Sequence, residues 1–453
     1  MNRTTAVLCF AIGLALTILR FPSGSVAVLL IVLLSAPIIF WLKRNTDDAD
    51  FLIQLFIGAL LVRVLFGVFV EWYDLFGFFG GDALTYDSLG KQIIAVWNGT
   101  ASPNDVWSRR AMSTGTPGWG INYLVAAIYS ITGPNILAGQ AFCAVVGAAT
   151  SPLAYLCSIN VFQNRRVGRF AALLVAFLPA FIIWSGQMLK DGLIVFLLVL
   201  AMTMVVRLQR RFEWYSVLFL ILSLGGILTL RFYIFYMVAI AVAGSLILSQ
   251  LGSVKSLVRG VVLLATLGVG LTYLGVFKTA TENFEKFGDL ERLQNSRLDQ
   301  TLRGESGFGE DIDVSTTQGA LTAMPVGLVY LMLAPFPWQA ESLRQAITIP
   351  EILVWWAMIP MIFTGLAYTV RNKLKEAIPI LIFTLMLTIA YSIFQGNVGT
   401  AYRQRTQIQV FLFMFIAVGW TLMREKRENR EMLRLAARQR QVAAMIGRHT
   451  EAR

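Results

Sequence analysis

The chain is poor in charge. Only 14% of its 453 residues are Asp, Glu, Lys or Arg, whereas 57% are hydrophobic. A soluble domain typically has about 25% charged and about 45–50% apolar residues. The composition therefore excludes a soluble enzyme, a disordered chain and a disulfide-stabilised secreted domain. It indicates a protein whose main solvent is lipid.

Histidine and cysteine are also scarce. The single histidine is His449, near the C-terminus, and the three cysteines are Cys9, Cys143 and Cys157. All three cysteines lie in apolar stretches without the spacing of metal ligands, so we expect small core residues. Histidine catalysis and a His/Cys metal centre are excluded, and acid–base work falls to carboxylates. No phosphate-binding loop, dinucleotide fingerprint or GxSxG motif occurs.

Long apolar runs are abundant, and most approach the length of about 20 residues that crosses a bilayer as a helix. We predict an all-α polytopic membrane protein with twelve spans. They lie at 5–20, 24–42, 51–70, 136–161, 170–185, 190–206, 214–230, 232–249, 258–276, 350–370, 377–395 and 406–423. The first of them is expected to be a retained span, because no small-residue cleavage site leads into a soluble domain. Two shorter apolar stretches, 118–133 and 322–336, are ambiguous.

The placement of charge predicts the topology. Lys and Arg cluster in short turns, at 43–44, 165–169, 207–211, 255–259 and 371–375, and in the tail 424–453, which has nine Lys/Arg and four Glu. Loop 71–117 instead has five Asp/Glu against three Lys/Arg, and loop 278–320 has nine against five. The positive-inside rule places the basic turns in the cytoplasm and both acidic loops outside. The net charge of +12 is thus explained by the membrane, and no nucleic-acid partner is predicted.

Alternation across the membrane decides the two ambiguous stretches. An odd number of crossings must join the outer loop at 71–117 to the inner turn at 165–169, so 118–133 is expected to lie in the interface. The same argument makes 322–336 interfacial or re-entrant. We therefore expect both termini in the cytoplasm. The predicted segments are two N-terminal spans (1–50), a module with spans and a catalytic outer loop at 71–135 (51–276), a second outer loop (277–349), C-terminal spans (350–423) and the tail.

The basic tail has two interpretations. Its arginines alternate with Leu, Ala and Met, as in an amphipathic helix that lies on anionic lipid. The simpler alternative is a solvated tail that anchors the last span.

The first outer loop carries the leading catalytic candidate. Asp82 follows two glycines, which leave the backbone free to turn and expose the carboxylate. If 82–95 is helical, Asp82 and Tyr86 share a face at the water–lipid boundary. A carboxylate there suits a general base. The alternative is that Asp82 only caps the helix.

Two other outer turns carry charge. Lys190 and Asp191 are adjacent between two apolar runs, as functional groups or as interfacial charges that extend to water. Tyr402, Arg403 and Arg405 lie at the outer end of the last span, against the positive-inside trend. Because arginines suit phosphate oxygens, they suggest an anionic ligand. Weaker cases are Arg231 at an outer turn and Arg63, which is expected to pair with a carboxylate inside a span.

These segments together resemble a known superfamily. The shared pattern runs over 51–206: Asp82 with Tyr86, Thr116-Pro117-Gly118 through Thr132-Gly133, Asn164-Arg165-Arg166, a span leading to Pro179, Trp184-Ser185 and Lys190-Asp191-Gly192. It is similar to the GT-C superfamily of membrane glycosyltransferases, including the bacterial mannosyltransferase and aminoarabinose-transferase-like branch. The resemblance implies catalytic carboxylates at Asp82 and Asp191 and an interfacial helix after the loop. Many relatives have paired acids where this chain has Asp82-Ala83; Asp87 is the nearest other acid.

The resemblance implies transfer of a sugar from a polyprenyl-phosphate-linked donor to a glycan, lipid or protein acceptor of the envelope, at the outer face of a bacterial inner membrane. Asp82 and Asp191 are the predicted catalytic residues. Residues predicted to bind substrate are Tyr86, Asp87, Lys190, Arg231, Tyr402, Arg403 and Arg405. No cofactor is predicted, and a divalent metal held by carboxylates is left as an alternative. The segment 333–338, Glu351 and 402–405 are also similar to envelope-polysaccharide proteins. Two rival functions stay open: a polymerase of lipid-linked repeat units and a transporter of polyprenyl lipid or glycan.

Overall fold

The computed structural model describes residues 3–21, 23–248, 254–273, 275–287, 289–303, 306–309 and 312–451. Over these residues the chain is helical, and the one β feature is an isolated bridge between Gly307 and Asn397. The all-α prediction is confirmed. The helices up to the middle of the chain are α1 (Arg3–Arg20), α2 (Gly24–Asn45), α3 (Ala49–Trp72), α4 (Phe76–Phe79), α5 (Asp82–Trp97), α6 (Val106–Met112), α7 (Gly120–Thr132), α8 (Ile136–Phe162), α9 (Arg165–Phe177), α10 (Pro179–Ser185) and α11 (Lys190–Arg210).

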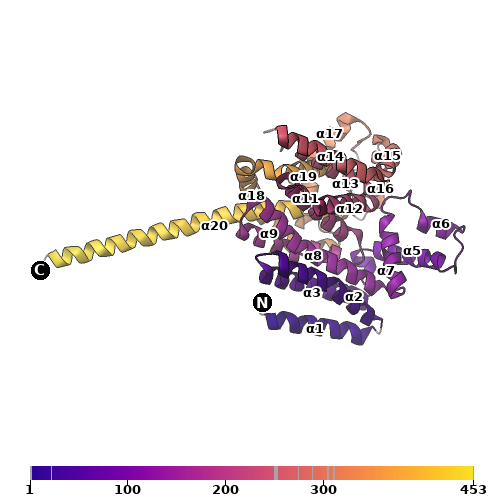
Figure 1. Ribbon diagram of the computed structural model, residues 1–453, viewed down its shortest axis with the longest axis horizontal. Coiled ribbons are helices and arrows are strands. Elements are labelled where there is room, and N and C mark those ends of the chain that lie inside the picture. Colours follow the sequence, from indigo (N-terminus) through magenta and orange to yellow (C-terminus); the bar gives the residue numbers. More distant parts are fainter. Residues whose placement is uncertain are drawn as a thin grey trace.

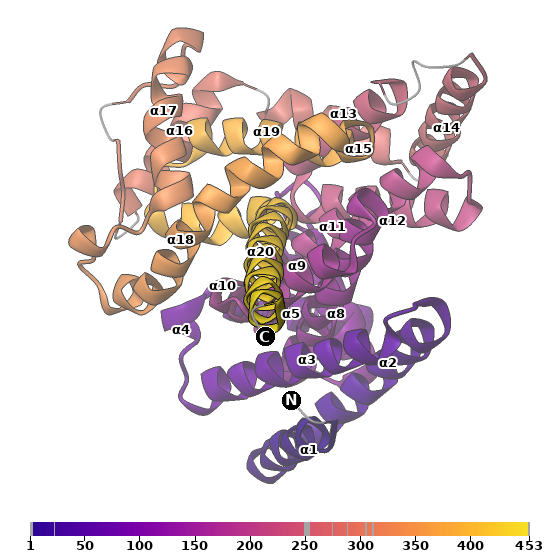
Figure 2. The same cartoon turned by 90° about the vertical axis from the view of Figure 1, so that its left-hand side faces the viewer.

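The remaining helices are α12 (Trp214–Leu230), α13 (Phe232–Leu248), α14 (Val254–Tyr273), α15 (Val276–Phe287), α16 (Leu290–Arg303), α17 (Thr317–Leu333), the short 3₁₀ helix η1 (Pro337–Gln339), α18 (Leu343–Asn372), α19 (Leu374–Phe394) and α20 (Val398–Glu451). The helices α5 and α6 lie at one end of the long axis, and α20 projects from the opposite end (Figure 1). The N-terminus lies toward the end from which α20 projects. Seen along α20, the helices α9, α11 and α18 pack around it (Figure 2).

The twelve predicted spans all fall on helices. Seven helices are long and apolar enough to cross a membrane: α2, α3, α8, α11, α18, α19 and the part of α20 up to Leu433. Two predicted spans are pairs of helices that meet at a bend, α9 with α10 at 56° and α14 with α15 at 76°. The other three fall on the shorter apolar helices α1, α12 and α13. The chain is therefore a multi-pass membrane protein.

The two ambiguous stretches are helices as well. The first is α7, whose 13 residues rise about 20 Å, too short for a hydrocarbon core of about 30 Å. This length agrees with its predicted interfacial place. The second is α17, which has 17 residues, as α12 and α13 do. Length does not separate α17 from those two helices, so its interfacial assignment stays a prediction.

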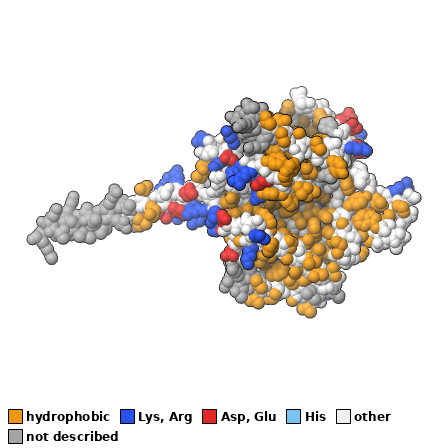
Figure 3. Space-filling view, viewed as in Figure 1, with side chains coloured by type: hydrophobic (Ala, Val, Ile, Leu, Met, Phe, Trp, Pro, Cys, Tyr) orange, Lys and Arg blue, Asp and Glu red, His pale blue; other side chains and the backbone are white. Residues whose placement is uncertain are grey.

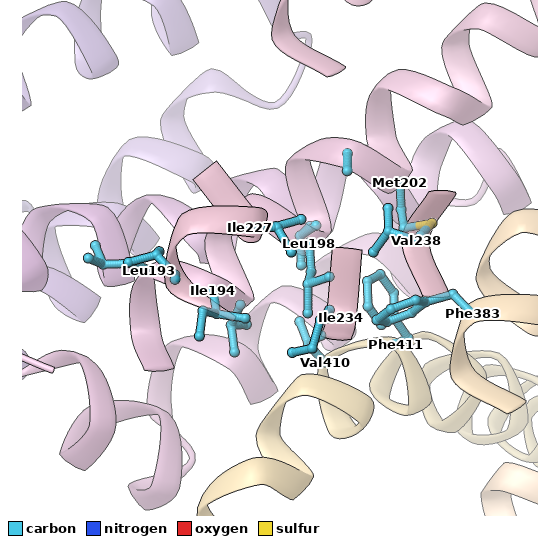
Figure 4. Packing of buried hydrophobic residues seen from close by; sticks show 14 of the residues in the cluster. Leu193, Ile194, Leu198, Met202, Ile227, Ile234, Val238, Phe383, Val410 and Phe411 are labelled. Atoms are coloured by element: carbon cyan, nitrogen blue, oxygen red, sulfur yellow. The ribbon is translucent and has the colours of Figure 1, made fainter. Parts of the chain in front are cut away.

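The short helix α10 packs against α8 and α11. Small side chains let these helices approach closely, as is common where lipid gives no hydrophobic drive to association. A Cβ atom at Gly147 of α8 would lie 2.4 Å from Ser185 of α10, and one at Gly192 of α11 would lie 2.6 Å from it. Larger residues fill the space between α11, α12, α13, α19 and α20 (Figure 4).

The cysteine prediction is confirmed for two of the three residues. Cys143 and Cys157 are buried in the bundle. The prediction is wrong for Cys9, which is exposed on α1. Since α1 lies at the edge of the bundle, an apolar residue there does not need a protein partner (Figure 2).

A break between α9 and α10 explains the buried Arg63. Pro179 cannot continue a helix because it has no N–H, so carbonyl groups at the end of α9 lose their partners. The guanidinium of Arg63 donates to the carbonyl oxygens of Ala176 (2.9 Å) and Val175 (3.1 Å), and to Oγ of Ser185 (2.8 Å). The expectation that Arg63 pairs with a carboxylate is therefore wrong, since these bonds go to carbonyl and hydroxyl groups. The arginine holds the bent span together.

The surface agrees with a membrane protein. Hydrophobic side chains cover the middle of the face shown in Figure 3, and Lys and Arg gather where α20 leaves the body. At that end Arg166 binds Glu428 of α20 (3.1 Å), and Nε of Arg169 donates to Asp48 (2.8 Å). The tail continues α20 as a helix to Glu451. The side chains of residues 436–451 lie outside the described part, so both interpretations of the tail stay predictions.

Candidate active site

The first outer loop brings Asp82 back against the bundle. After α3 the chain turns through α4 and the two glycines 80 and 81, and α5 begins at Asp82. A Cβ atom at Gly80 would lie 3.1 Å from Leu189, so the glycine allows the loop to approach the start of α11. The loop thus places Asp82 beside the turn that carries Lys190 and Asp191.

Asp82 binds an arginine and does not cap its helix. The residue at the cap position of α5 is Gly81, and no side chain caps the first turn. Instead Nη1 of Arg403 donates to Oδ2 of Asp82 at 2.7 Å. The Asp82 side chain is 50% exposed, so one side of the carboxylate is open to solvent or substrate. The helix-cap alternative therefore does not describe this carboxylate.

Asp191 is the buried partner of two arginines. Its side chain is completely buried at the start of α11. Nε of Arg403 donates to Oδ2 at 2.6 Å, and Nη2 of Arg231 lies 3.3 Å from Oδ1. The carboxylate of Asp191 on α11 thus joins one arginine from the α12–α13 turn and one from α20. The arrangement fixes the guanidinium of Arg403 between a buried carboxylate and a half-exposed one.

Other predicted residues surround this cluster. Tyr86 is one turn after Asp82 on α5, and burial, followed by the charge of Asp82, raises the pKa of its phenol well above the usual value. The phenol therefore stays protonated and is available as a hydrogen-bond donor. Nζ of Lys190 lies against Gly118, where a Cβ atom would approach it to 2.6 Å. Gly118 has a positive φ of 84°, a backbone conformation that favours glycine.

Three predicted residues have other partners. The Asp87 carboxylate accepts hydrogen bonds from Tyr129 (2.6 Å) and Lys91 (2.7 Å). The hydroxyl group of Tyr402 donates to Glu351 at 2.7 Å.

Arg405 is fully buried, and its Nη1 donates to the carbonyl oxygens of Met332 (3.2 Å) and Ala334 (2.8 Å) at the end of α17. The structure gives these side chains roles within the fold and does not bring them to the Asp82–Arg403–Asp191 cluster.

Trp184 was not predicted as a site residue. Its ring lies 5.4 Å from the guanidinium carbon of Arg403. An aromatic face at this distance stabilises the cation and restricts its movement. The available signal was an indole at an outer turn six residues before Lys190, but an aromatic residue at that depth usually only anchors a span in the interface.

A pocket opens next to Arg403. It has a volume of about 410 Å³ and lies between α4, α10, α18 and the start of α20. One part of its wall is apolar, with Phe78, Phe79 and Ile183, and another carries Arg344 and Arg403. Among the described residues that line it there is no carboxylate. The pocket therefore suits a molecule that joins an anionic group to an apolar one.

The carboxylates are arranged around arginine. Among the described residues, no group of three or more His, Cys, Asp or Glu side chains is placed to hold a metal ion. Arg403 stands where the two site carboxylates face each other, so a cation that joined them would have to displace it.

The chain is similar to known glycosyltransferases. Residues 118–279 match the sequence profile of the dolichyl-phosphate-mannose-protein mannosyltransferase family. None of the curated protein sequences matches the chain significantly. Among solved structures, the archaeal oligosaccharyltransferase AglB from Archaeoglobus fulgidus, in complex with an inhibitory peptide and a dolichol-phosphate, aligns with a TM-score of 0.50 at 14% identity, over 86% of this chain and 52% of that one.

A second solved structure, ArnT from Cupriavidus metallidurans bound to undecaprenyl phosphate, aligns with a TM-score of 0.47 at 12% identity, over 77% of this chain and 60% of that one. The chain thus spans about half to three fifths of the length of these two proteins. The family match and the fold shared with AglB agree with the sequence pattern found over 51–206. The predicted resemblance of this chain to the GT-C superfamily of membrane glycosyltransferases is therefore confirmed.

Proposed function

We propose that the chain is a membrane glycosyltransferase that moves a sugar from a polyprenyl-phosphate-linked donor to an envelope glycan, lipid or protein acceptor. The observation that carries the proposal is the position of Arg403. It binds the half-exposed Asp82 and the buried Asp191, and it also lines the 410 Å³ pocket. A general base (Asp82), a group that binds phosphate (Arg403) and a pocket for an amphiphilic lipid thus adjoin one another.

Asp82 is the proposed general base. Its exposed side is open to an acceptor hydroxyl, whereas Asp191 is completely buried and cannot reach one. Asp82 takes the proton of that hydroxyl as the oxygen forms a bond to the anomeric carbon of the donor sugar. The bond between that carbon and the phosphate oxygen breaks, and the lipid phosphate leaves with the electron pair.

Arg403 is the proposed partner of the leaving phosphate. Guanidinium groups bind phosphate oxygens with two parallel hydrogen bonds and stabilise the charge that develops on them. Arg231 and Lys190 add positive charge around the same buried carboxylate. Asp191 is then a positioning residue that orients Arg403. Arg405 is left out of this mechanism because it binds backbone carbonyls elsewhere.

The pocket is the proposed site of the donor lipid. Its apolar wall, formed by Phe78, Phe79 and Ile183, suits a polyprenyl chain, and Arg403 suits the phosphate. The AglB structure that shares this fold holds a dolichol-phosphate. The proposed orientation puts this pocket on the outer face of a bacterial inner membrane. The basic residues at the base of α20 lie at the other end, and the positive-inside rule assigns them to the cytoplasm.

The test uses Asp82→Asn in purified, reconstituted protein supplied with polyprenyl-phosphate sugars. We expect transfer to be lost, because an amide cannot accept the proton. Binding of undecaprenyl phosphate is expected to tighten up to about fivefold, because Asp82 no longer competes for Arg403 and an exposed ion pair contributes at most about 1 kcal/mol. Asp74→Asn, in the same loop with φ of 51°, is the matched control, since Asn tolerates this backbone conformation.

Near-normal turnover of Asp82→Asn would contradict the proposal. The reconstituted original protein separates the proposed function from its two rivals. Transfer only from lipid-diphosphate oligosaccharides identifies a polymerase. Movement of lipid or glycan across the membrane without a covalent product identifies a transporter.

A further inference from the structure

Glu351 is a buried carboxylate that the proposed mechanism does not use. It lies on α18 and is 5% exposed. Its Oε2 atom accepts two hydrogen bonds, one from the hydroxyl group of Tyr402 at 2.7 Å and one from the backbone N–H of Ala180 at 2.9 Å. The donors come from α20 and α10, so one oxygen atom joins three helices that are far apart in the sequence.

Both donors lie in helices that contain or contact Arg403. Tyr402 precedes Arg403 on α20, so fixing its side chain fixes the rotation of the helix at that point. Ala180 is the second residue of the short helix α10, and Trp184 follows it one turn later on the same face. The ring of Trp184 in turn lies against the guanidinium of Arg403 at 5.4 Å and against the ring of Tyr402 at 6.4 Å.

The contacts therefore form a closed ring that joins α18, α20 and α10. Glu351 holds α20 through Tyr402 and holds α10 through Ala180, and the two helices meet at Arg403 and Trp184. A carboxylate is costly to bury in a bundle core unless hydrogen bonds or charges compensate it. The two hydrogen bonds to Oε2 provide this compensation, and the guanidinium of Arg405, which lies 5.2 Å from the ring of Tyr402, adds positive charge in the same region.

We infer that Glu351 is a positioning residue of the active site, which sets the place of Arg403 relative to the donor phosphate. The inference rests on the proposed function and deepens it. Glu351 does not touch substrate. It acts through Tyr402 and α10. Its loss therefore weakens binding of the donor phosphate by Arg403 and leaves binding of the acceptor near Asp82 unchanged.

Two substitutions of Glu351 separate geometry from charge. In Glu351→Gln the amide oxygen can still accept both hydrogen bonds, so we expect the donor KM to stay within about threefold of the original. In Glu351→Leu both bonds are lost, and we expect the donor KM to rise at least tenfold while the acceptor KM is unchanged. Tyr402→Phe removes a single hydroxyl group and is expected to fall between them. It remains informative where Glu351→Leu fails to fold.

A control on the same helix measures simple destabilisation. Thr369 donates to the carbonyl of Gly365 and is fully buried, 18 positions and about 27 Å along α18 from Glu351. Thr369→Val removes this bond without reaching α10 or the start of α20. We expect it to lower Vmax, if anything, through loss of folded protein, with both KM values unchanged. Hydrogen exchange is followed in residues 179–186 and 398–405 of each variant.

The expected result for Glu351→Leu is faster exchange in both segments together with the selective rise in donor KM. A normal donor KM, or a fall in Vmax alone like that of Thr369→Val, would overturn the inference. So would a Glu351→Gln variant as impaired as Glu351→Leu, because charge and not hydrogen bonding would then matter. Absence of transfer by the original protein would instead overturn the proposed function, while the exchange data would still report whether Glu351 joins the two segments.

Discussion

The Nε atom of Arg403 lies 2.6 Å from Oδ2 of Asp191, although the two residues are 212 positions apart in the chain. The same guanidinium reaches Asp82, 321 positions away, through Nη1 at 2.7 Å. The two carboxylates differ in their surroundings, because Asp191 is completely buried and Asp82 is 50% exposed. Arg403 is therefore held by a strong ion pair with the buried Asp191 and by a weaker ion pair with the half-exposed Asp82.

This difference in burial predicts that two conservative variants lose very different amounts of stability. Asp191→Asn leaves Arg231 and Arg403 buried without their carboxylate, which typically costs about 3–5 kcal/mol. Asp82→Asn breaks an exposed pair that contributes at most about 1 kcal/mol. We expect thermal unfolding in detergent to shift strongly for Asp191→Asn and little for Asp82→Asn, although both lose transfer. Equal unfolding temperatures for the two variants would contradict the assignment of Asp191 as the buried anchor.

The sequence singled out the members of the central cluster one at a time. Asp82 was selected because it follows two glycines, Asp191 because it lies in a charged turn between apolar runs, and Arg231 and Arg403 because they lie at outer helix ends. The structure brings these four residues together, and their roles stay predictions. Their pairing could not be predicted. The two contacts of Arg403 join residues 212 and 321 positions apart, and hydropathy gives the order of spans along the chain without their neighbours in space.

The same reasoning selected Arg405, which has a different role. Position at an outer helix end does not show which face of α20 a residue occupies, and two positions along a helix rotate a side chain by about 200°. Arg403 therefore faces the site, whereas Arg405 faces the end of α17. Glu351 and Trp184 carried part of the resemblance but were not predicted as site residues, because their contacts come from packing between α10, α18 and α20.

The basic end of the bundle predicts a dependence of stability on pH. Asp48, between α2 and α3, accepts hydrogen bonds from Nε of Arg169 and from Tyr155, both at 2.8 Å. The hydrogen bond from Arg169 is the main cause that lowers the pKa of Asp48 below its usual value. A carboxyl whose pKa is lower in the folded state stabilises the fold above its unfolded pKa, near 3.8, and this stabilisation is lost as pH falls through the folded value.

We therefore expect Asp48→Asn to unfold at a lower temperature than the original protein at pH 7. The difference is expected to narrow as pH falls below about 4, where the original carboxyl also gains a proton. Thermal unfolding in detergent at a series of pH values measures this. The neighbouring Asp47→Asn is the control, because Asp47 is 90% exposed and pairs only loosely with Arg165 at 3.4 Å. A gap between Asp48→Asn and the original protein that stays constant down to pH 3 would contradict the prediction.

Arg403 and Arg405 provide the sharpest comparison, because the same substitution at two positions of one helix has different expected results. Lysine keeps the charge but cannot form the forked hydrogen bonds of a guanidinium. Arg403→Lys is expected to raise the donor KM and lower kcat by at least tenfold, since Arg403 is the proposed partner of the donor phosphate. Arg405→Lys loses bonds to the carbonyls at the end of α17, so we expect a lower unfolding temperature, equivalent to about 1–3 kcal/mol, with unchanged donor KM per folded molecule. Steady-state kinetics normalised to folded protein give both values. A larger rise in donor KM for Arg405→Lys than for Arg403→Lys would reverse the two roles and move the phosphate site toward α17.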